Sequence, residues 1–155
     1  MLLFGLKICE SPSPFGRGGN IFRQRVRAVN ASYKLFAIYL RELIAWNKKF
    51  NLTSITDPEE IKLKHFADSL SLLQAYNLTT ESVIDIGTGA GFPGIPLKIA
   101  CPGIKLTLLE ATRKKTEFLR HIVDVLQLKD VKIIWGRAED HHGQYDLVVA
   151  RAIAK

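Results

Sequence analysis

The chain has 155 residues, of which 47% are apolar and 24% are charged, and this profile predicts one globular domain with its own hydrophobic core. No apolar run approaches the roughly 20 residues that a membrane-spanning helix needs, so the sequence argues against a membrane protein. The formal net charge is +7, and the excess lies in residues 1–50, which hold nine basic and two acidic side chains. A basic region favours a polyanionic partner such as nucleic acid, although a solvated basic tail has the same composition.

The N-terminal part of the chain changes character near residue 30. Residues 1–30 include SPSPFGRGGN, which has no periodicity, and they are expected to be a disordered or extraneous basic extension. Residues 31–155 are expected to form the functional domain. This domain begins with apolar residues at helical spacing from Ser32 onward, which predict a helix that ends at Asn51.

A second helix and an α/β alternation follow. The sequence DPEE at residues 57–60 predicts a helix start, with an Asp cap, a Pro in the first turn and acids near the positive end of the helix dipole. This helix is expected to run to about Tyr76. Strands are predicted at Ser82–Ile86, Lys105–Leu109, Val131–Trp135 and Leu147–Ala150, with helices at Pro93–Ala100 and Lys114–Leu128. Such alternation predicts a parallel sheet with right-handed crossovers.

The run VIDIGTGAGFPG at residues 83–94 places four glycines between a buried strand and a helix. A bare turn of this kind makes room for a ligand and aims backbone amides at its anionic part. Two glycine patterns overlap here. Residues 89–94 fit G-x-G-x-x-G, the dinucleotide fingerprint, whereas residues 87–91 fit G-x-G-x-G, which is associated with S-adenosylmethionine in class I methyltransferases. A tight turn with no ligand is a third interpretation.

The register of the loop favours the methyl donor. The apolar strand ends at Ile86, directly before Gly87, as expected when the tight turn begins there. Asp85 is placed to meet the cationic amine of S-adenosylmethionine and would repel a pyrophosphate. Glu110 ends the second strand, where a carboxylate can accept bonds from both ribose hydroxyls of either cofactor. On this reasoning the cofactor-binding residues include Asp85, Gly89, Gly91 and Glu110.

Several longer motifs occur in a fixed order: WNKKFNLTSITDPEEI, KHFADSL, VIDIGTGAGFPGIPL, LTLLEATRKKTEFL, GRAED and YDLVVARAIA. Over roughly residues 33–154 the chain resembles the guanine-N7 methyltransferases of 16S small-subunit ribosomal RNA, the glucose-inhibited division protein B family. The pairing of WN-x-x-x-NLT with H-x-x-DS ahead of the glycine loop is far more specific than the loop itself.

The resemblance implies an α/β fold, the class I (Rossmann-like) S-adenosylmethionine-dependent methyltransferase sheet, with an N-terminal helical segment. It also implies a cytoplasmic, monomeric enzyme with no membrane association, which uses S-adenosylmethionine to methylate N7 of a guanine in 16S ribosomal RNA or in the small ribosomal subunit. By motif match the cofactor contacts are Gly87, Phe92, Ala138, Glu139 and Arg151.

Candidate substrate residues lie in the N-terminal helices. His65 and Asp68 are three residues apart, so they share a helix face, and they are predicted to line the guanine pocket. The alternative is a His that simply pairs with a nearby acid. Lys48 and Lys49 are predicted to face the RNA, together with Arg41. No essential general base is expected, because N7 of guanine carries a free lone pair.

No metal site is expected, because the pair His141-His142 has no second ligand pair. The chain ends at Lys155, right after the fourth predicted strand, whereas a class I methyltransferase sheet usually continues with further strands. The sheet is therefore expected to be incomplete at its C-terminal end, with reduced or no activity in this form. A non-catalytic RNA-binding remnant and an NAD-dependent oxidoreductase are the alternative functions.

Overall fold

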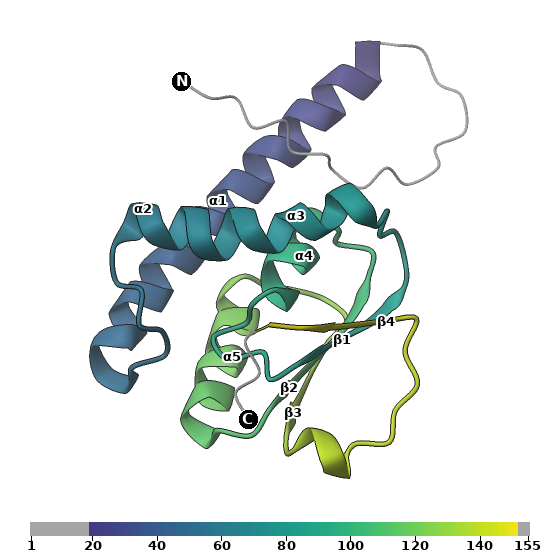
Figure 1. Cartoon of the computed structure of the whole chain (residues 1–155). Coiled ribbons are helices and arrows are strands. Elements are labelled where there is room, and N and C mark those ends of the chain that lie inside the picture. Colours follow the sequence, from purple (N-terminus) through teal and green to yellow (C-terminus); the bar gives the residue numbers. More distant parts are fainter. Residues whose placement is uncertain (1–18, 152–155) are drawn as a thin grey trace.

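The structure is a computed structural model that describes residues 19–151, with side chains described from Ala28 onward. Its centre is a four-stranded sheet in the order β3-β2-β1-β4, in which every pair of neighbouring strands is parallel (Figure 1). The strands are β1 (Ser82–Ile86), β2 (Lys105–Glu110), β3 (Val131–Trp135) and β4 (Leu147–Ala150). The parallel α/β sheet is confirmed, and each predicted strand is found within one residue of its expected ends.

Two helices connect the strands and cover one face of the sheet. α4 (Gly94–Ala100) joins β1 to β2, and α5 (Arg113–Val125) joins β2 to β3. Both steps go the same way along the sheet, so right-handed crossovers place both helices on the same face. The chain then returns past β1 to form β4. The carboxyl end of β1 is therefore the point at which the strand order reverses, where ligands bind in open parallel sheets.

The first helix, α1 (Gly19–Phe50), packs against both α4 and α5 (Figure 1). Residues 1–30 were expected to be a disordered or extraneous extension, and disorder is wrong for residues 19–30, which are helical. The reason is local: the stretch IFRQRVRAVN holds neither Gly nor Pro and is rich in residues that favour helices. Residues 1–18 lie outside the described part of the chain, and the domain boundary near residue 31 stays a prediction.

The second predicted helix has the expected extent but contains an irregular turn. It comprises α2 (Pro58–Ile61), the π-helical segment η1 (Lys62–Ala67) and α3 (Asp68–Ala75). Asp57 caps its start, since one carboxylate oxygen accepts the amides of Glu59 and Glu60 at 3.0 and 2.9 Å. π-helical turns are rare and often lie at functional sites. No pattern in the sequence indicated this π-helical turn.

An aromatic cluster joins the N-terminal helices to the glycine loop. Tyr39 of α1 is fully buried, with its ring centroid 5.3 Å from that of Phe66 and 5.4 Å from that of Phe92. Its hydroxyl donates to the backbone carbonyl of Ala90 at 2.6 Å. The aromatic core therefore fixes the glycine loop against α1 and η1. Within residues 19–151, no helix is long and apolar enough to cross a membrane.

Candidate active site

The glycine loop follows β1 and has the backbone that only glycine adopts easily. Gly87, Gly89 and Gly91 have φ angles of 65°, 62° and 101°. A Cβ atom on Gly91 would lie 2.5 Å from Cδ1 of Ile95 and 2.7 Å from the hydroxyl of Tyr39, so packing also excludes a side chain there. A Cβ atom on Gly89 would meet nothing closer than 4.0 Å, so the loop is open to a ligand at Gly89.

Most backbone amides of the loop are bonded within the protein. Those of Gly87 and Thr88 donate to the carbonyl of Leu109 at 2.9 and 3.2 Å, and those of Gly91 and Phe92 both donate to the carbonyl of Thr88 at 2.9 Å. The expectation that these amides are free for a ligand is therefore wrong. At its open side the loop lets a ligand approach the bare backbone closely. The charges around the loop come from side chains.

Asp85 lies beneath the loop and holds it in place. Its Oδ2 accepts the hydroxyl of Thr88 at 2.6 Å and the amide of Gly94 at 2.7 Å. Its Oδ1 is buried and has no hydrogen-bond partner among the residues described. Burial raises the pKa of Asp85 to about 6, against the lowering effect of these two hydrogen bonds. A buried carboxylate with an unpaired oxygen favours a positive charge nearby.

Glu110 ends β2 and links two turns. Its Oε2 accepts the amide of Gly89 at 2.9 Å, and its Oε1 accepts the amide of Thr112 at 2.8 Å. Each carboxylate oxygen keeps a further lone pair for another donor. The loop after β3 is tied to the same place, because the amide of Gly136 donates to the carbonyl of Glu110 at 3.1 Å. Glu110 is therefore fixed at the carboxyl edge of the sheet, between the glycine loop and the β3 loop.

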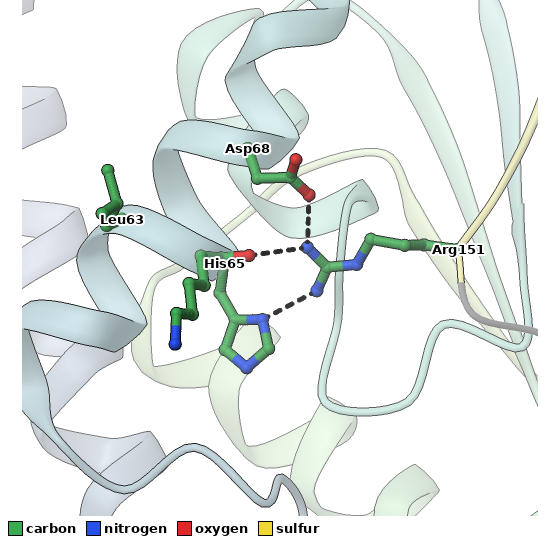
Figure 2. A pocket seen from close by; sticks show the side chains of 5 residues that line it. Leu63, His65, Asp68 and Arg151 are labelled. Atoms are coloured by element: carbon green, nitrogen blue, oxygen red, sulfur yellow. Dashed lines mark hydrogen bonds and ion pairs between the residues drawn. The ribbon is translucent and has the colours of Figure 1, made fainter.

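A second group of predicted residues meets around Arg151, which directly follows β4. Its NH1 donates to Oδ2 of Asp68 at 2.9 Å, and its NH2 donates to Nδ1 of His65 at 2.9 Å (Figure 2). The guanidinium also lies 5.3 Å from the ring centroid of Phe92, which His65 stacks on at 4.5 Å with an angle of 13° between the rings. The fold thus joins the H-x-x-DS motif, the glycine loop and the VAR sequence.

These side chains border a pocket of about 490 Å³, lined by Leu63, Lys64, His65, Asp68 and Arg151. The alternative that His65 pairs with a nearby acid is not what the structure has, because the acid Asp68 bonds Arg151 instead. Phe92 has two roles. It is buried in the aromatic core, and its ring contacts the His65 ring and the Arg151 guanidinium, which line the pocket.

Asn47 and Thr53 belong to this group, although sequence reasoning did not single them out. The hydroxyl of Thr53 lies 2.9 Å from Nε2 of His65. The side-chain amide of Asn47 bonds both backbone groups of Thr53, donating to its carbonyl at 3.0 Å and accepting its amide at 2.9 Å. The signal was available in the motif WN-x-x-x-NLT, which holds both residues.

The remaining predicted residues lie at the rim. Ala138 and Glu139 are exposed in the short 3₁₀ turn η2 (Ala138–Asp140), which follows β3 and so lies at the same sheet edge as Glu110. Lys48 and Lys49 are exposed in the last turn of α1. Residues 19–151 contain no cluster of three metal-ligating side chains.

Comparison with known proteins identifies the family. Residues 32–155 match the family model described as rRNA small subunit methyltransferase G. The chain belongs to the rRNA small subunit methyltransferase G family. This membership confirms the resemblance in the motifs, and it decides between the two glycine patterns in favour of G-x-G-x-G.

Curated relatives carry the name ribosomal RNA small subunit methyltransferase G. The relative from Dictyoglomus thermophilum is 47% identical over 147 residues, which cover 87% of this chain and 61% of the relative. The relative from Roseiflexus castenholzii is 52% identical, over 77% of this chain and 54% of its own length. That from Alkaliphilus metalliredigens is 52% identical, over 72% of this chain and 50% of its own length. The chain thus spans 50–61% of these relatives.

Solved structures agree on the fold. A coclaurine N-methyltransferase bound to N-methylheliamine and SAH superposes with a TM-score of 0.53 at 14% identity, over 87% of this chain and 46% of the other. A putative S-adenosyl-L-methionine-dependent methyltransferase from Methanococcus maripaludis gives 0.50 at 23% identity, over 61% of this chain and 47% of the other. The class I methyltransferase fold that the rRNA small subunit methyltransferase G motifs imply is therefore confirmed.

Proposed function

We propose that the chain is part of an S-adenosylmethionine-dependent methyltransferase that methylates N7 of a guanine in 16S ribosomal RNA. The observation that carries this proposal is the meeting of His65, Phe92 and Arg151, from three separate family motifs, beside the glycine loop. The family of the chain supports the same reaction.

The donor side of the site would use residues from the carboxyl edge of the sheet. Glu110 would accept the ribose hydroxyls, and Ala138 and Glu139 would lie near the adenine. Gly87 and Gly89 would face the amino-acid end of the donor. Asp85 is fully buried, so it would act on the cationic amine through its charge rather than by contact. Bound there, the donor supplies a methyl group on a positively charged sulfur, which is a good leaving group.

The acceptor side would be the pocket at His65 and Asp68. The side chain of Asp68 is 57% exposed, so its carboxylate is within reach of the N–H groups on the Watson–Crick edge of an unpaired guanine. N7 attacks with its own lone pair, so the protein has to orient the base rather than remove a proton. Orientation of this kind can supply about 7–11 kcal/mol of a barrier.

The RNA backbone would lie along the end of α1. Lys48 and Lys49 are exposed there, and Arg41 is exposed earlier in the same helix. Lysine and arginine contacts to phosphates give affinity that depends on salt and not on sequence. We also propose that the protein works as a monomer in the cytoplasm, where the small ribosomal subunit is found; light scattering on the purified chain tests the monomer.

A binding panel tests the proposal. The purified chain is mixed in turn with S-adenosylhomocysteine, with NADH and with a fragment of 16S RNA, and the midpoint of thermal unfolding is followed. We expect stabilisation by the first and the third, because a ligand that binds only the folded state raises its stability. RNA binding without any response to S-adenosylhomocysteine would favour the RNA-binding remnant, and a response to NADH would favour the oxidoreductase.

Label transfer from S-adenosylmethionine to unmethylated small subunits tests the reaction itself. The relative from Alkaliphilus metalliredigens serves as the reference. It is 52% identical to this chain, which covers 50% of its length. We expect the label on N7 of the same guanine that the relative methylates. Label on another atom would refute the N7 assignment.

A further inference from the structure

His65 makes a directional contact on each side of its ring and a stacking contact on one face. Its Nδ1 faces NH2 of Arg151 at 2.9 Å, and its Nε2 faces the hydroxyl of Thr53 at 2.9 Å (Figure 2). The ring lies on Phe92 at 4.5 Å. These contacts leave the ring little rotational freedom, so its two nitrogens are distinguishable by their partners.

The partner of Nδ1 decides where the proton of the ring lies. An arginine guanidinium has only donors, and it stays charged at any pH that a protein tolerates. Nδ1 must therefore be the acceptor and carry no proton, so the proton of the neutral ring lies on Nε2. That N–H then donates to the hydroxyl oxygen of Thr53, which also accepts the amide of Ile55 at 3.2 Å.

Thr53 is itself held rigidly. Asn47 bonds both its carbonyl and its amide, so the position of the hydroxyl follows from the end of α1. A chain of contacts consequently runs from Asn47 through Thr53 and His65 to Arg151. These contacts connect the helices to the end of β4. The last of them joins His65 and Arg151, which are 86 residues apart in the sequence.

The π-helical segment η1 adds a second anchor for the same guanidinium. The amide of Asp68 donates to the carbonyls of His65 and Leu63, which leaves the carbonyl of Lys64 without that helical donor. NH1 of Arg151 donates to the Lys64 carbonyl at 3.2 Å and to the Asp68 carboxylate at 2.9 Å. Arg151 therefore has three acceptors, which are the carbonyl of Lys64, the carboxylate of Asp68 and Nδ1 of His65.

We propose that His65 is a positioning residue, which in its neutral Nε2–H form holds the guanidinium of Arg151 over Phe92 at the cofactor side of the pocket and releases it when protonated. The inference rests on the proposed function, because it concerns the orientation of a residue that would contact the donor. A proton on Nδ1 turns the acceptor into a donor that faces the N–H of Arg151, so the contact becomes repulsive.

The charges around His65 agree with a neutral ring. Burial and the charge of Arg151 lower the pKa of His65, and the carboxylate of Asp68 opposes them. Arg151 comes from the end of β4 and Asp68 from α3, while Phe92 and Thr53 bring no charge. Lys64, which lines the same pocket, pairs with Glu60 at 2.6 Å. The neutral form is the stable one at pH 7, and the protonated form appears as pH falls below the lowered pKa.

Nitrogen-detected NMR on the unaltered chain tests the tautomer without any cofactor. At pH 7 we expect Nδ1 of His65 to resonate as an unprotonated nitrogen and Nε2 as a protonated one. In the Arg151→Ala variant the ring should lose this preference, and its pKa should rise because a positive neighbour is gone. A proton on Nδ1 in the unaltered protein, or the same pKa in both proteins, would overturn the inference.

Two variants test the positioning role through the affinity for S-adenosylhomocysteine. His65→Phe keeps the stack on Phe92 but removes both hydrogen bonds, and it should weaken binding about tenfold at pH 7.5, because a hydrogen bond to a charged group is lost. His65→Asn keeps an acceptor near the place of Nδ1, and it should bind within about threefold of the unaltered protein, by the same reasoning.

Acid conditions separate the variants further. Asp85 also titrates near pH 6, so the comparison is between proteins and not between pH values. The unaltered protein should lose more affinity than His65→Asn between pH 7.5 and a pH below the pKa of His65 that NMR gives. Equal losses, or a His65→Phe protein that binds normally, would overturn the positioning role. If the unaltered protein bound no S-adenosylhomocysteine at all, the proposed function would fail, while the NMR result would still decide the contact with Arg151.

Discussion

Gly91 offers the sharpest test of how the loop is built, through the substitution Gly91→Ala. The φ angle of 101° lies outside the left-handed region that other residues reach, which costs on the order of 1–3 kcal/mol. The new Cβ would also lie 2.5 Å from Cδ1 of Ile95 and 2.7 Å from the hydroxyl of Tyr39. Overpacking of this kind costs about 1–3 kcal/mol more. We therefore expect a loss of about 2–6 kcal/mol in the free energy of unfolding.

Gly89→Ala is the matched control for that loss. Its φ angle of 62° is within the left-handed region, and its Cβ would have no neighbour closer than 4.0 Å, so we expect a cost of about 1–2 kcal/mol. Urea unfolding of the two variants gives both values. Gly89→Ala should instead weaken binding of S-adenosylhomocysteine, since it adds a methyl group on the open side of the loop.

A double-mutant cycle separates strain from crowding at Gly91. Ile95→Val removes Cδ1, the atom nearest to the new methyl group, and alone it should cost about 0.5–1.5 kcal/mol. Combined with Gly91→Ala it should recover part of the loss, so the two effects should not add. Additive effects, or a Gly91→Ala protein as stable as Gly89→Ala, would refute the view that packing makes Gly91 necessary.

Three further predictions concern charge. Asp85→Asn should remove a pH dependence of the free energy of unfolding. Urea unfolding of both proteins from pH 4 to pH 8 measures it, as a change with pH in the difference between their midpoints. Glu110→Gln should weaken binding of S-adenosylhomocysteine at least about tenfold by calorimetry, because one carboxylate oxygen is replaced by a donor. Lys48→Glu with Lys49→Glu should weaken RNA binding and flatten its salt dependence in filter assays, with Lys132→Glu as an exposed control and with cofactor affinity unchanged.

The sign of the Asp85 prediction follows from its pKa. The pKa is about 6 in the folded protein against 3.8 for the ordinary group, so the folded state takes up a proton first as pH falls. Asp85 thus makes the unaltered protein gain stability relative to the variant as pH falls from 7 to 4, by at most about 3 kcal/mol. A constant difference over this range would contradict the buried, partly unpaired carboxylate.

Sequence patterns predicted the sheet well because its strands are short runs with sharp boundaries. The runs Ser82–Ile86, Val131–Trp135 and Leu147–Ala150 are apolar segments with turn residues or charges on both sides, and the structure has the same ends. The start of α1 was missed because the Ser-, Pro- and Gly-rich composition of the residues before Gly19 was taken to describe the whole segment up to residue 30. The π-helical η1 was missed because a helix start signal and apolar spacing do not report a local change from i→i+4 to i→i+5 hydrogen bonds.

The sequence motifs predicted which residues belong to the site. They did not predict which of these residues contact one another. His65, Phe92 and Arg151 were each chosen from separate motifs, and only the folded chain shows that they touch. The loop amides were misjudged because glycine patterns report backbone freedom, whereas the carbonyls of Leu109 and Thr88, which accept these amides, leave no pattern in the sequence.

Calorimetric titration with S-adenosylhomocysteine, run in parallel on the unaltered chain and on Glu110→Gln, tests most directly whether the edge of this sheet holds a methyl donor. We expect one bound molecule per chain, with an affinity that drops at least about tenfold in the variant. Absence of binding heat in the unaltered chain, or equal affinity in both proteins, would contradict it.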